Sequence, residues 1–444
     1  MFKRKVWNEL KHWKDNWAGR YAVLVEGPRR VGKTTIVREF VRSEYKSSIV
    51  IDFSQNDPVL KTVFEEYRTL DDFFGQLQDL TGAILYERQS AIVFDEVQRY
   101  PKARQMIKHL VEDGRYDYIE TGTLISIKKN VRNILIPSEE MTVQMRPMDF
   151  QEFMWATGSP FPEDYLKRCF DEGTAVSRAI HEEMMGKFAV YMAVGGMPQC
   201  IAEYVRTGRF TEVEVAKQSI LDLYRDDITK IREPTGSKAR AIFKNIPSAL
   251  SKREKTFSPA DIAVGSRSRD YINAIDWLSE SKTVNICYRC TDPDPALDFH
   301  IDTNSFKVYM ADSGLLMTMA FGSNSAKDEI YDMVLNRNLG LNRGMLFENV
   351  VAQELAAKGY RLAFSKRRSE NNTYGLEVDF VIADGRSIVP IEVKSGERSS
   401  SHKSLDDFLE TYGRRIERAY VIHPKNLRVD GKIGYLPIYM TMFI

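Results

Sequence analysis

The sequence of 444 residues has little of what membrane-spanning and secreted proteins depend on. No run approaches the roughly 18 apolar residues of a membrane-spanning helix, and residues 1–17 lack the uninterrupted apolar segment of a secretory signal. Four cysteines are too few for a disulfide scaffold at this length, which agrees with a reducing compartment. We therefore expect a cytoplasmic protein without stable membrane insertion.

The sequence also lacks the residue patterns of several kinds of functional site. The six histidines are scattered outside any H-E-x-x-H or triad context, so nothing indicates nucleophilic catalysis. Cys287 and Cys290 have zinc-ligand spacing, but a structural zinc site needs four ligands and only His300 lies nearby in the sequence. Sixty-three basic and sixty-two acidic residues leave a formal charge of +1, so any attraction to nucleic acid must come from local patches.

What is present is typical of a folded chain with several domains. Hydrophobic residues make up 43% and charged residues 28% of the sequence, which excludes the disordered and fibrous classes. At about 100 to 200 residues per domain, the length predicts two to four domains. We expect an α/β domain with an N-terminal helix over 1–150, a helical lid or connector over 151–235, a winged helix over 236–330 and a second α/β domain over 331–444.

The first of these domains begins with a basic segment that has the spacing of an amphipathic helix. Val6, Leu10, Trp13 and Trp17 recur at helical intervals. Such a helix either binds a membrane surface or nucleic acid, or docks its tryptophans on the following domain, and we favour docking. Between residues 21 and 150, five short β-rich runs alternate with helical stretches, which predicts a parallel sheet flanked by helices.

The segment after the first of these strands has the pattern of a phosphate-binding loop. It reads G-x-x-x-x-G-K-T between the strand YAVLVE and a helical run. Gly27 and Gly32 would let the loop curl with its amide groups inward, Lys33 would contact the β and γ phosphates, and Thr34 would bind Mg²⁺. The alternative is a glycine turn with an exposed lysine. The predicted nucleotide-binding residues are Gly27, Pro28, Arg29, Arg30, Val31, Gly32, Lys33, Thr34 and Thr35.

Two carboxylates end the buried strand AIVF and would complete this site. Asp95 would orient Mg²⁺ through water, and Glu96 would align or deprotonate the attacking water. The strand YDYIE runs into Thr121-Gly122-Thr123, where a polar side chain could contact the γ-phosphate. We favour Thr123 for this role over a plain turn at the strand end.

GPRRVGKTT, VFDEVQRYP and ETGT resemble the AAA-type ATPases of bacteria and archaea that carry a C-terminal nuclease-like domain. The likeness extends through PMDFQEF (147–153), GGMP (195–198), KVYMADSGLL (307–316) and LFENVVAQEL (346–355). The resemblance implies ATP hydrolysis with ATP and Mg²⁺ as cofactors. Because such ATPases usually complete the site with an arginine from a neighbouring subunit, it also implies a homo-oligomer.

The identity of that arginine is open. Relatives often have Gly-Arg ahead of the PMDFQEF segment, whereas this sequence reads Pro137-Ser138-Glu139 there. Arg115, Arg132 and Arg146 are the candidates.

The last domain contains carboxylates in a predicted β-hairpin. Asp384-Gly385 is a turn signal, and a two-residue turn there would place Asp379 opposite Pro390 and Glu377 opposite Glu392. Alternation would put Asp379, Glu392 and Lys394 on one side of the sheet. The other side would hold Val378, Phe380, Ile382, Ile391 and Val393.

An acid on the preceding helix is expected to join them. Glu348 shares a core-facing stripe with Val351, Ala352 and Leu355, and a buried carboxylate needs a partner. A second divalent metal held by Glu348, Asp379 and Glu392, with Lys394 beside the scissile phosphate, would catalyse phosphodiester hydrolysis. This E-x-K after a lone Asp resembles the PD-(D/E)xK restriction-endonuclease-like family, although Val378 replaces its usual proline. A hairpin with a salt-bridged solvent face is the alternative.

DNA is the expected macromolecular partner. In the predicted winged helix, Tyr271, Ala274, Ile275 and Leu278 form the buried stripe and leave Arg267, Arg269 and Asn273 for phosphates or a groove. Packing of this module against the ATPase or another subunit is the alternative.

The sequence thus predicts an ATP-binding and ATP-hydrolysing protein that couples its nucleotide cycle to a DNA-associated, metal-dependent nuclease module. The second hypothesis is an ATP-operated switch or scaffold whose C-terminal module binds nucleic acid or protein without cleavage.

Overall fold

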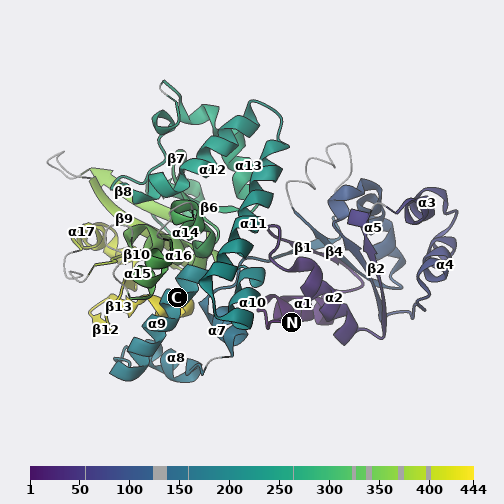
Figure 1. Cartoon of the computed structure of the whole chain (residues 1–444), viewed down its shortest axis with the longest axis horizontal. Coiled ribbons are helices and arrows are strands. Elements are labelled where there is room, and N and C mark those ends of the chain that lie inside the picture. Colours follow the sequence, from purple (N-terminus) through teal and green to yellow (C-terminus); the bar gives the residue numbers. More distant parts are fainter. Residues whose placement is uncertain are drawn as a thin grey trace. The chain divides into compact units, whose positions relative to one another are not determined.

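The computed structural model divides the chain into two compact units, Met1–Arg146 and Pro147–Ile444 (Figure 1). It describes residues 1–55, 57–123, 138–158, 160–263, 265–322, 327–336, 343–368, 375–396 and 402–444. The first unit contains the predicted phosphate-binding loop, and the second contains the predicted acid cluster.

The first unit is built on a parallel sheet, as the five β-rich runs predict. Its strand order is β2-β3-β4-β1-β5, and each neighbouring pair is parallel. Even-numbered side chains of β1 and β3 enter one hydrophobic core and odd-numbered ones enter another, so both faces of the sheet are covered. The strands are β1 (Ala22–Glu26), β2 (Ser47–Asp52), β3 (Ser90–Asp95), β4 (Asp117–Gly122) and β5 (Glu140–Gln144).

Helices cover the two faces of this sheet (Figure 1). Side chains of α3 (Pro58–Glu66), α4 (Leu70–Thr81) and α5 (Pro101–Asp113) form one core with the sheet. α1 (Val6–Asn16) and α2 (Lys33–Glu44) form the other. Leu10 and Trp13 of α1 are 0% and 1% exposed in that core, which confirms that the basic N-terminal helix docks on its own domain.

The second unit surrounds a mixed eight-stranded sheet with helices. The strand order is β12-β13-β11-β10-β9-β8-β6-β7. The strands are β6 (Val284–Cys290), β7 (Ile301–Met310), β8 (Ala363–Arg368), β9 (Gly375–Asp384), β10 (Ser387–Val393), β11 (Ala419–His423), β12 (Arg428–Asp430) and β13 (Ile433–Pro437). The helices are α7 (Phe150–Thr157), α8 (Glu163–Glu172), α9 (Arg178–Val194), α10 (Pro198–Thr207), α11 (Phe210–Thr229), α12 (Thr235–Ser251), α13 (Ile272–Glu280), α14 (Ser313–Phe321), α15 (Lys327–Leu335), α16 (Arg343–Ala357) and α17 (Lys403–Tyr412).

The strands expected as the wing of a winged helix belong to this large sheet. β6 and β7 form the expected antiparallel pair, but β6 also pairs with β8 in parallel, Tyr288 opposite Ala363. Of the three expected helices, α12 and α13 are present, whereas the middle one is a single 3-10 turn over Pro259–Asp261. The pairing of β6 with β8 joins segments far apart in the sequence, so the helix and strand pattern could not show it. Residues 147–444 thus form one compact unit across the predicted limits at 235 and 330.

α16 is a buried helix with polar side chains. Every residue from Met345 to Ala356 is buried, including Glu348, Asn349, Gln353 and Glu354. Asn349 exchanges hydrogen bonds with the backbone of Met310, 2.8 and 3.2 Å long. Gln353 accepts from the backbone N–H of Ser313 (2.7 Å), and Glu354 accepts from that of Phe150 (2.9 Å). The polar side chains of α16 therefore fix the start of α7 and the end of β7 with the segment after it against this helix.

The motif segments GGMP and KVYMADSGLL contact each other in this interior. Asp312 begins α14 by accepting from the backbone N–H of Leu315 at 2.9 Å, and it also accepts from that of Gly196 at 2.5 Å. A Cβ at Gly195 would lie 2.3 Å from Asp312 Oδ1, and Gly195 has a φ of +82°. Glycine is needed there for both its conformation and its size.

Among the described helices, none is long and apolar enough to cross a membrane.

Candidate functional site

The phosphate-binding loop lies at the carboxyl end of β1 and leads into α2. Gly32 has a φ of +97°, the left-handed conformation that its predicted role requires. Gly27 is required for another reason, because a Cβ there would lie 2.1 Å from the backbone oxygen of Met145. Arg30 also adopts a positive φ, +65°, which is uncommon for a residue with a side chain. Of the other predicted loop residues, Pro28 and Val31 are buried, Arg29 is half-buried, and Arg30 and Thr35 are exposed.

Lys33 is buried, with its ammonium turned into the loop. Its Nζ donates to the backbone oxygens of Gly27 and Pro28, both at 3.0 Å. Burial lowers the pKa of Lys33 to about 8, and the nearby carboxylates of Glu96 and Asp95 offset only part of this effect. The alternative reading of this segment, a turn with an exposed lysine, is excluded because Lys33 is only 5% exposed.

A hydroxyl and a carboxylate suited to Mg²⁺ lie side by side at this edge of the sheet. The Thr34 hydroxyl donates to Asp95 Oδ1 at 2.9 Å, and the Thr121 hydroxyl donates to the same oxygen at 2.5 Å. Asp95 is 2% exposed, and Arg38 Nη2 lies 3.8 Å from its other oxygen. Because Mg²⁺ prefers such oxygen ligands, the residues fit the predicted metal.

Thr121 also positions the second acid. The backbone N–H of Glu96 donates to Thr121 Oγ1 at 3.1 Å, and Gln98 Nε2 donates to Glu96 Oε2 at 2.6 Å. Glu96 has a φ of +57°, so the backbone turns sharply at the strand end. Sequence reasoning chose Thr123, which is 9% exposed and follows β4, and its contact with the γ-phosphate stays a prediction. The missed signal for Thr121 is its place at the end of the strand beside β3.

The three candidate trans-acting arginines have different surroundings. Arg115 is held by Asp113 at 2.8 Å and Asp71 at 2.6 Å. Arg146 Nη2 donates to Gln144 Oε1 at 3.3 Å. Arg132 lies outside the described residues. The choice among them, and the homo-oligomer that would use one, stay predictions.

A fourth arginine, which sequence reasoning missed, contacts the loop itself. Arg4 precedes α1 and is 6% exposed. Its Nη1 donates to the backbone oxygen of Val31 at 3.1 Å, and its Nη2 donates to that of Arg146 at 2.6 Å. Arg4 therefore joins the N-terminal segment, the phosphate-binding loop and the end of the first unit. Because Arg4 lies in a basic segment, the sequence did not distinguish it from exposed surface charges.

In the second unit, the four predicted site residues converge. Glu348 lies on α16, Asp379 on β9, and Glu392 and Lys394 at the end of β10. Lys394 Nζ lies 2.5 Å from Glu392 Oε1, and Asp379 Oδ2 accepts from the backbone N–H of Val393 at 2.8 Å. Burial together with the neighbouring Glu348 and Glu392 raises the pKa of Asp379.

The hairpin that carries these acids differs in register from the prediction. Its turn residues are Gly385 and Arg386, because Asp384 pairs with Ser387. Pro390 therefore faces Val381, and the predicted pairing of Asp379 with Pro390 is wrong. Ile391 faces Phe380, so one further step along the register brings Glu392 opposite Asp379. Gly385, with a φ of +58°, takes the first turn position, where glycine is favoured.

A β-bulge beside Asp379 also breaks the predicted alternation. Val381 pairs with Ala363 and Val378 pairs with Ser365, so three steps along β9 match two along β8. The Phe380 ring lies 5.6 Å from that of Tyr309, whose hydroxyl donates to Glu348. Phe380 thus shares the side of the acid cluster, contrary to the prediction.

Two lysines that sequence reasoning missed enter the acid cluster. Lys307 on β7 is fully buried, and its Nζ lies 2.7 Å from Glu377 Oε1, 3.2 Å from Glu348 Oε1 and 3.8 Å from Asp379 Oδ1. Lys255 pairs with the other oxygen of Glu348. Burial alone would raise the pKa of Glu348, but Lys307 and Lys255 outweigh it and lower that pKa. Lys307 and Tyr309 are two residues apart on β7, so their side chains share one face of the strand. This K-x-Y spacing is the signal from which their place in the cluster could have been predicted.

This arrangement does not fit the predicted second metal. The Lys307 ammonium already lies beside two of the metal's three predicted ligands, Glu348 and Asp379, and the third, Glu392, pairs with Lys394. The described residues also contain no group of three His, Cys, Asp or Glu side chains placed to hold a metal ion. The alternative prediction, a hairpin with salt-bridged acids, agrees better with these contacts, although the cluster is buried and not on a solvent face.

The predicted DNA-contacting residues lie on the surface. Arg267, Arg269 and Asn273 are exposed at and before α13. The predicted buried stripe of this helix is confirmed, since Tyr271, Ala274, Ile275 and Leu278 are at most 3% exposed.

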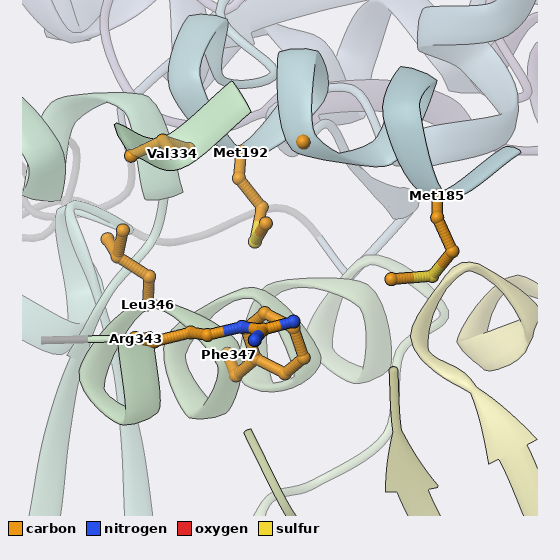
Figure 2. Close-up of a pocket in the computed structure, with 7 residues that line it drawn as sticks. Met185, Met192, Val334, Arg343, Leu346 and Phe347 are labelled. Carbon is orange, nitrogen blue, oxygen red and sulfur yellow. The ribbon is translucent and has the colours of Figure 1, made fainter. Parts of the chain in front are cut away.

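Figure 2 shows a pocket lined by residues of α9, α15 and α16. Met185 and Met192 line one side, and Phe347 and Arg343 line the other. The Arg343 guanidinium lies 4.9 Å from the centre of the Phe347 ring. None of the predicted site residues lines this pocket.

Three family models match separate parts of the chain. Residues 19–154 match an AAA domain. Residues 185–326 match a domain of unknown function (DUF8612), and residues 343–440 match another (DUF4143). The first unit is therefore a P-loop domain of the AAA type, as its loop, strand order and acid pair indicate. No curated protein matches the chain.

Several solved structures align weakly with the chain. The ORC1 protein of Aeropyrum pernix in complex with DNA is 12% identical, with a TM-score of 0.27, over 73% of this chain and 93% of that chain. Cdc6p of Pyrobaculum aerophilum is 11% identical, with a TM-score of 0.25, over 74% and 92%. PCH-2 of C. elegans is 13% identical, with a TM-score of 0.27, over 50% and 70%. Alignments this weak transfer neither fold nor function.

Replacing Arg4 should weaken both nucleotide binding and folding. Arg4→Ala removes two hydrogen bonds from a charged donor, so we expect the free energy of unfolding to fall by about 1.5–3 kcal/mol and the Kd for ATP to rise about tenfold. Chemical denaturation and calorimetric titration measure the two effects. Arg20→Ala is the matched control, because Arg20 is exposed and its loss changes the net charge equally. Equal effects of both substitutions would contradict this role.

Nucleotide affinity should depend on pH through Lys33. The phosphate groups bind the ammonium form, and a pKa of about 8 means that this form is lost as the pH rises through 8. The Kd for ATP should therefore rise about tenfold between pH 7 and pH 9, where the phosphates themselves stay ionised. Titration of a fluorescent nucleotide at several pH values measures it. In Lys33→Arg, any residual binding should not vary over this range, and a constant Kd in the unmodified protein would refute the prediction.

Proposed function

We propose that the first unit binds ATP with Mg²⁺ and hydrolyses it. The observation that carries this proposal is the contiguous set of Lys33, Thr34, Asp95 and Thr121 at one edge of the parallel sheet, directly behind a loop with the phosphate-binding pattern. The AAA domain match over residues 19–154 supports it.

Each residue has a distinct task in this proposal. Lys33 and the loop amides hold the phosphates, and Thr34 with Asp95 holds Mg²⁺, which neutralises charge on the phosphate oxygens. Glu96 aligns the attacking water or takes its proton, and Gln98 and Thr121 fix the position of Glu96. Thr121 touches both acids, so it keeps the metal-binding and water-aligning groups in register.

For the second unit we propose a switch that binds DNA without cutting it. The buried ammonium of Lys307 between the carboxylates favours this function over cleavage, and the exposed Arg267, Arg269 and Asn273 supply the DNA contacts. Metal-dependent cleavage by Glu348, Asp379, Glu392 and Lys394 is the second candidate, and the convergence of these four residues favours it.

Two substitutions test the proposed ATPase. Lys33→Ala should abolish nucleotide binding, and Glu96→Gln should leave binding intact while lowering phosphate release by about 10²- to 10⁴-fold, because only the second removes the general base. Calorimetric titration and a phosphate-release assay measure the two steps. Glu87→Gln, at an exposed position, is the matched control. Normal hydrolysis by Glu96→Gln would remove Glu96 from the mechanism.

The two functions of the second unit are separated by incubating the protein with duplex, single-stranded and branched DNA plus Mg²⁺ or Mn²⁺. We expect a mobility shift without cleavage products, and a weaker shift in the double variant Arg267→Ala/Arg269→Ala because two phosphate contacts are lost. Lys394→Ala should bind DNA as the unmodified protein does. Products that disappear in Asp379→Asn and Lys394→Ala would establish the nuclease instead.

A further inference from the structure

We propose that the ammonium of Lys307 is the resident cation of the acid cluster and that this site takes no divalent metal. Lys307 is 0% exposed, and three carboxylates from α16 and β9 surround its Nζ at 2.7 to 3.8 Å. This inference concerns the second unit alone and does not depend on ATP hydrolysis.

The ammonium of Lys307 lies where the predicted second metal ion would have to bind. A divalent ion bound by carboxylates lies about 2.0–2.6 Å from their oxygens, which is in the middle of the cluster. Lys307 Nζ lies beside two of the predicted ligands, 3.2 Å from Glu348 and 3.8 Å from Asp379, and it is 2.7 Å from the further carboxylate of Glu377. A metal ion could not enter among these oxygens unless the ammonium moved, because both are cations competing for the same partners.

The remaining charges of the cluster are also matched within the chain. Lys255 pairs with Glu348, and Lys394 lies 2.5 Å from Glu392. Each of the three acids predicted to bind the second metal therefore has a lysine ammonium within 4 Å. Buried carboxylates need a counter-charge from a cationic side chain or a metal ion, and here lysines from three separate segments supply it.

The neighbours of Lys307 hold its side chain in this position. The Phe364 ring lies beneath the ammonium, 5.0 Å from Nζ, and Tyr309 on the same face of β7 donates to Glu348. The lysine and tyrosine at the start of the segment KVYMADSGLL thus connect β7 to α16 and β9. Asp312, later in the same segment, caps α14, so both parts of the segment make contacts inside the unit.

Binding of Mn²⁺ alone to the nucleotide-free, full-length protein tests this inference. Electron paramagnetic resonance counts bound Mn²⁺, and thermal unfolding with Mn²⁺ or a chelator reports its effect on stability. We expect the unmodified protein and Asp379→Asn to bind equal amounts of Mn²⁺, since any weak binding at the phosphate-binding loop is common to both. For the same reason, any difference in unfolding temperature between Mn²⁺ and chelator should be equal in these two proteins.

Removing the ammonium should open the site to a metal. Lys307→Met keeps the apolar stem of the side chain, so we expect it to bind one more Mn²⁺ per chain and to unfold at a higher temperature with Mn²⁺ than with chelator. Lys366→Met is the matched control, because Lys366 lies on β8, the strand beside β9, with its Nζ 3.8 Å from Glu377, and this variant should gain no Mn²⁺.

Two results would overturn the inference. One is a Mn²⁺ ion bound by the unmodified protein and lost in Asp379→Asn. The other is a folded Lys307→Met that gains no ion. If Lys307→Met does not fold, the comparison of the unmodified protein with Asp379→Asn decides alone.

Discussion

The second unit depends on satisfying the polar side chains of one fully buried helix. α16 carries Glu348, Asn349, Gln353 and Glu354 into the interior, and each would destabilise the fold strongly if left without partners. Their hydrogen bonds reach the backbone of α7, of β7 and of the residue that opens α14. These bonds fix the relative positions of elements that are distant in sequence, which hydrophobic contacts alone would specify less tightly.

The architecture of the first unit could be predicted from sequence because its signals are local. Five apolar runs, the glycine-rich loop and the acids after AIVF each lie within a few residues, and the parallel order follows from strands separated by helices. What the sequence left out are contacts across the fold. Thr121 reaches Asp95 only because β4 lies beside β3, and Arg4 reaches the loop only because α1 docks on it.

In the second unit, the sequence predicted which acids and which lysine lie close together, but not the chemistry of the cluster that they form. Alternation and helical spacing brought Glu348, Asp379, Glu392 and Lys394 to one place, even though the turn position was wrong. The bulge at β9 and the pairing of β6 with β8 depend on neighbours that no local pattern encodes. Because that pairing brings β7 into the same sheet, it also brings Lys307 to the acids and changes what the cluster can do.

The close approach of Gly27 to Met145 has a mechanical consequence. The backbone N–H of Met145 donates to the oxygen of Glu26 at 2.7 Å, and Arg4 grips the next carbonyl along. The polypeptide thus leaves the first unit while still fastened to the rim of the phosphate-binding loop, and Pro147 follows immediately. Met145 and Arg146 therefore cannot move away from the loop without breaking these two hydrogen bonds, so the exit of the chain from the first unit is set by the loop itself.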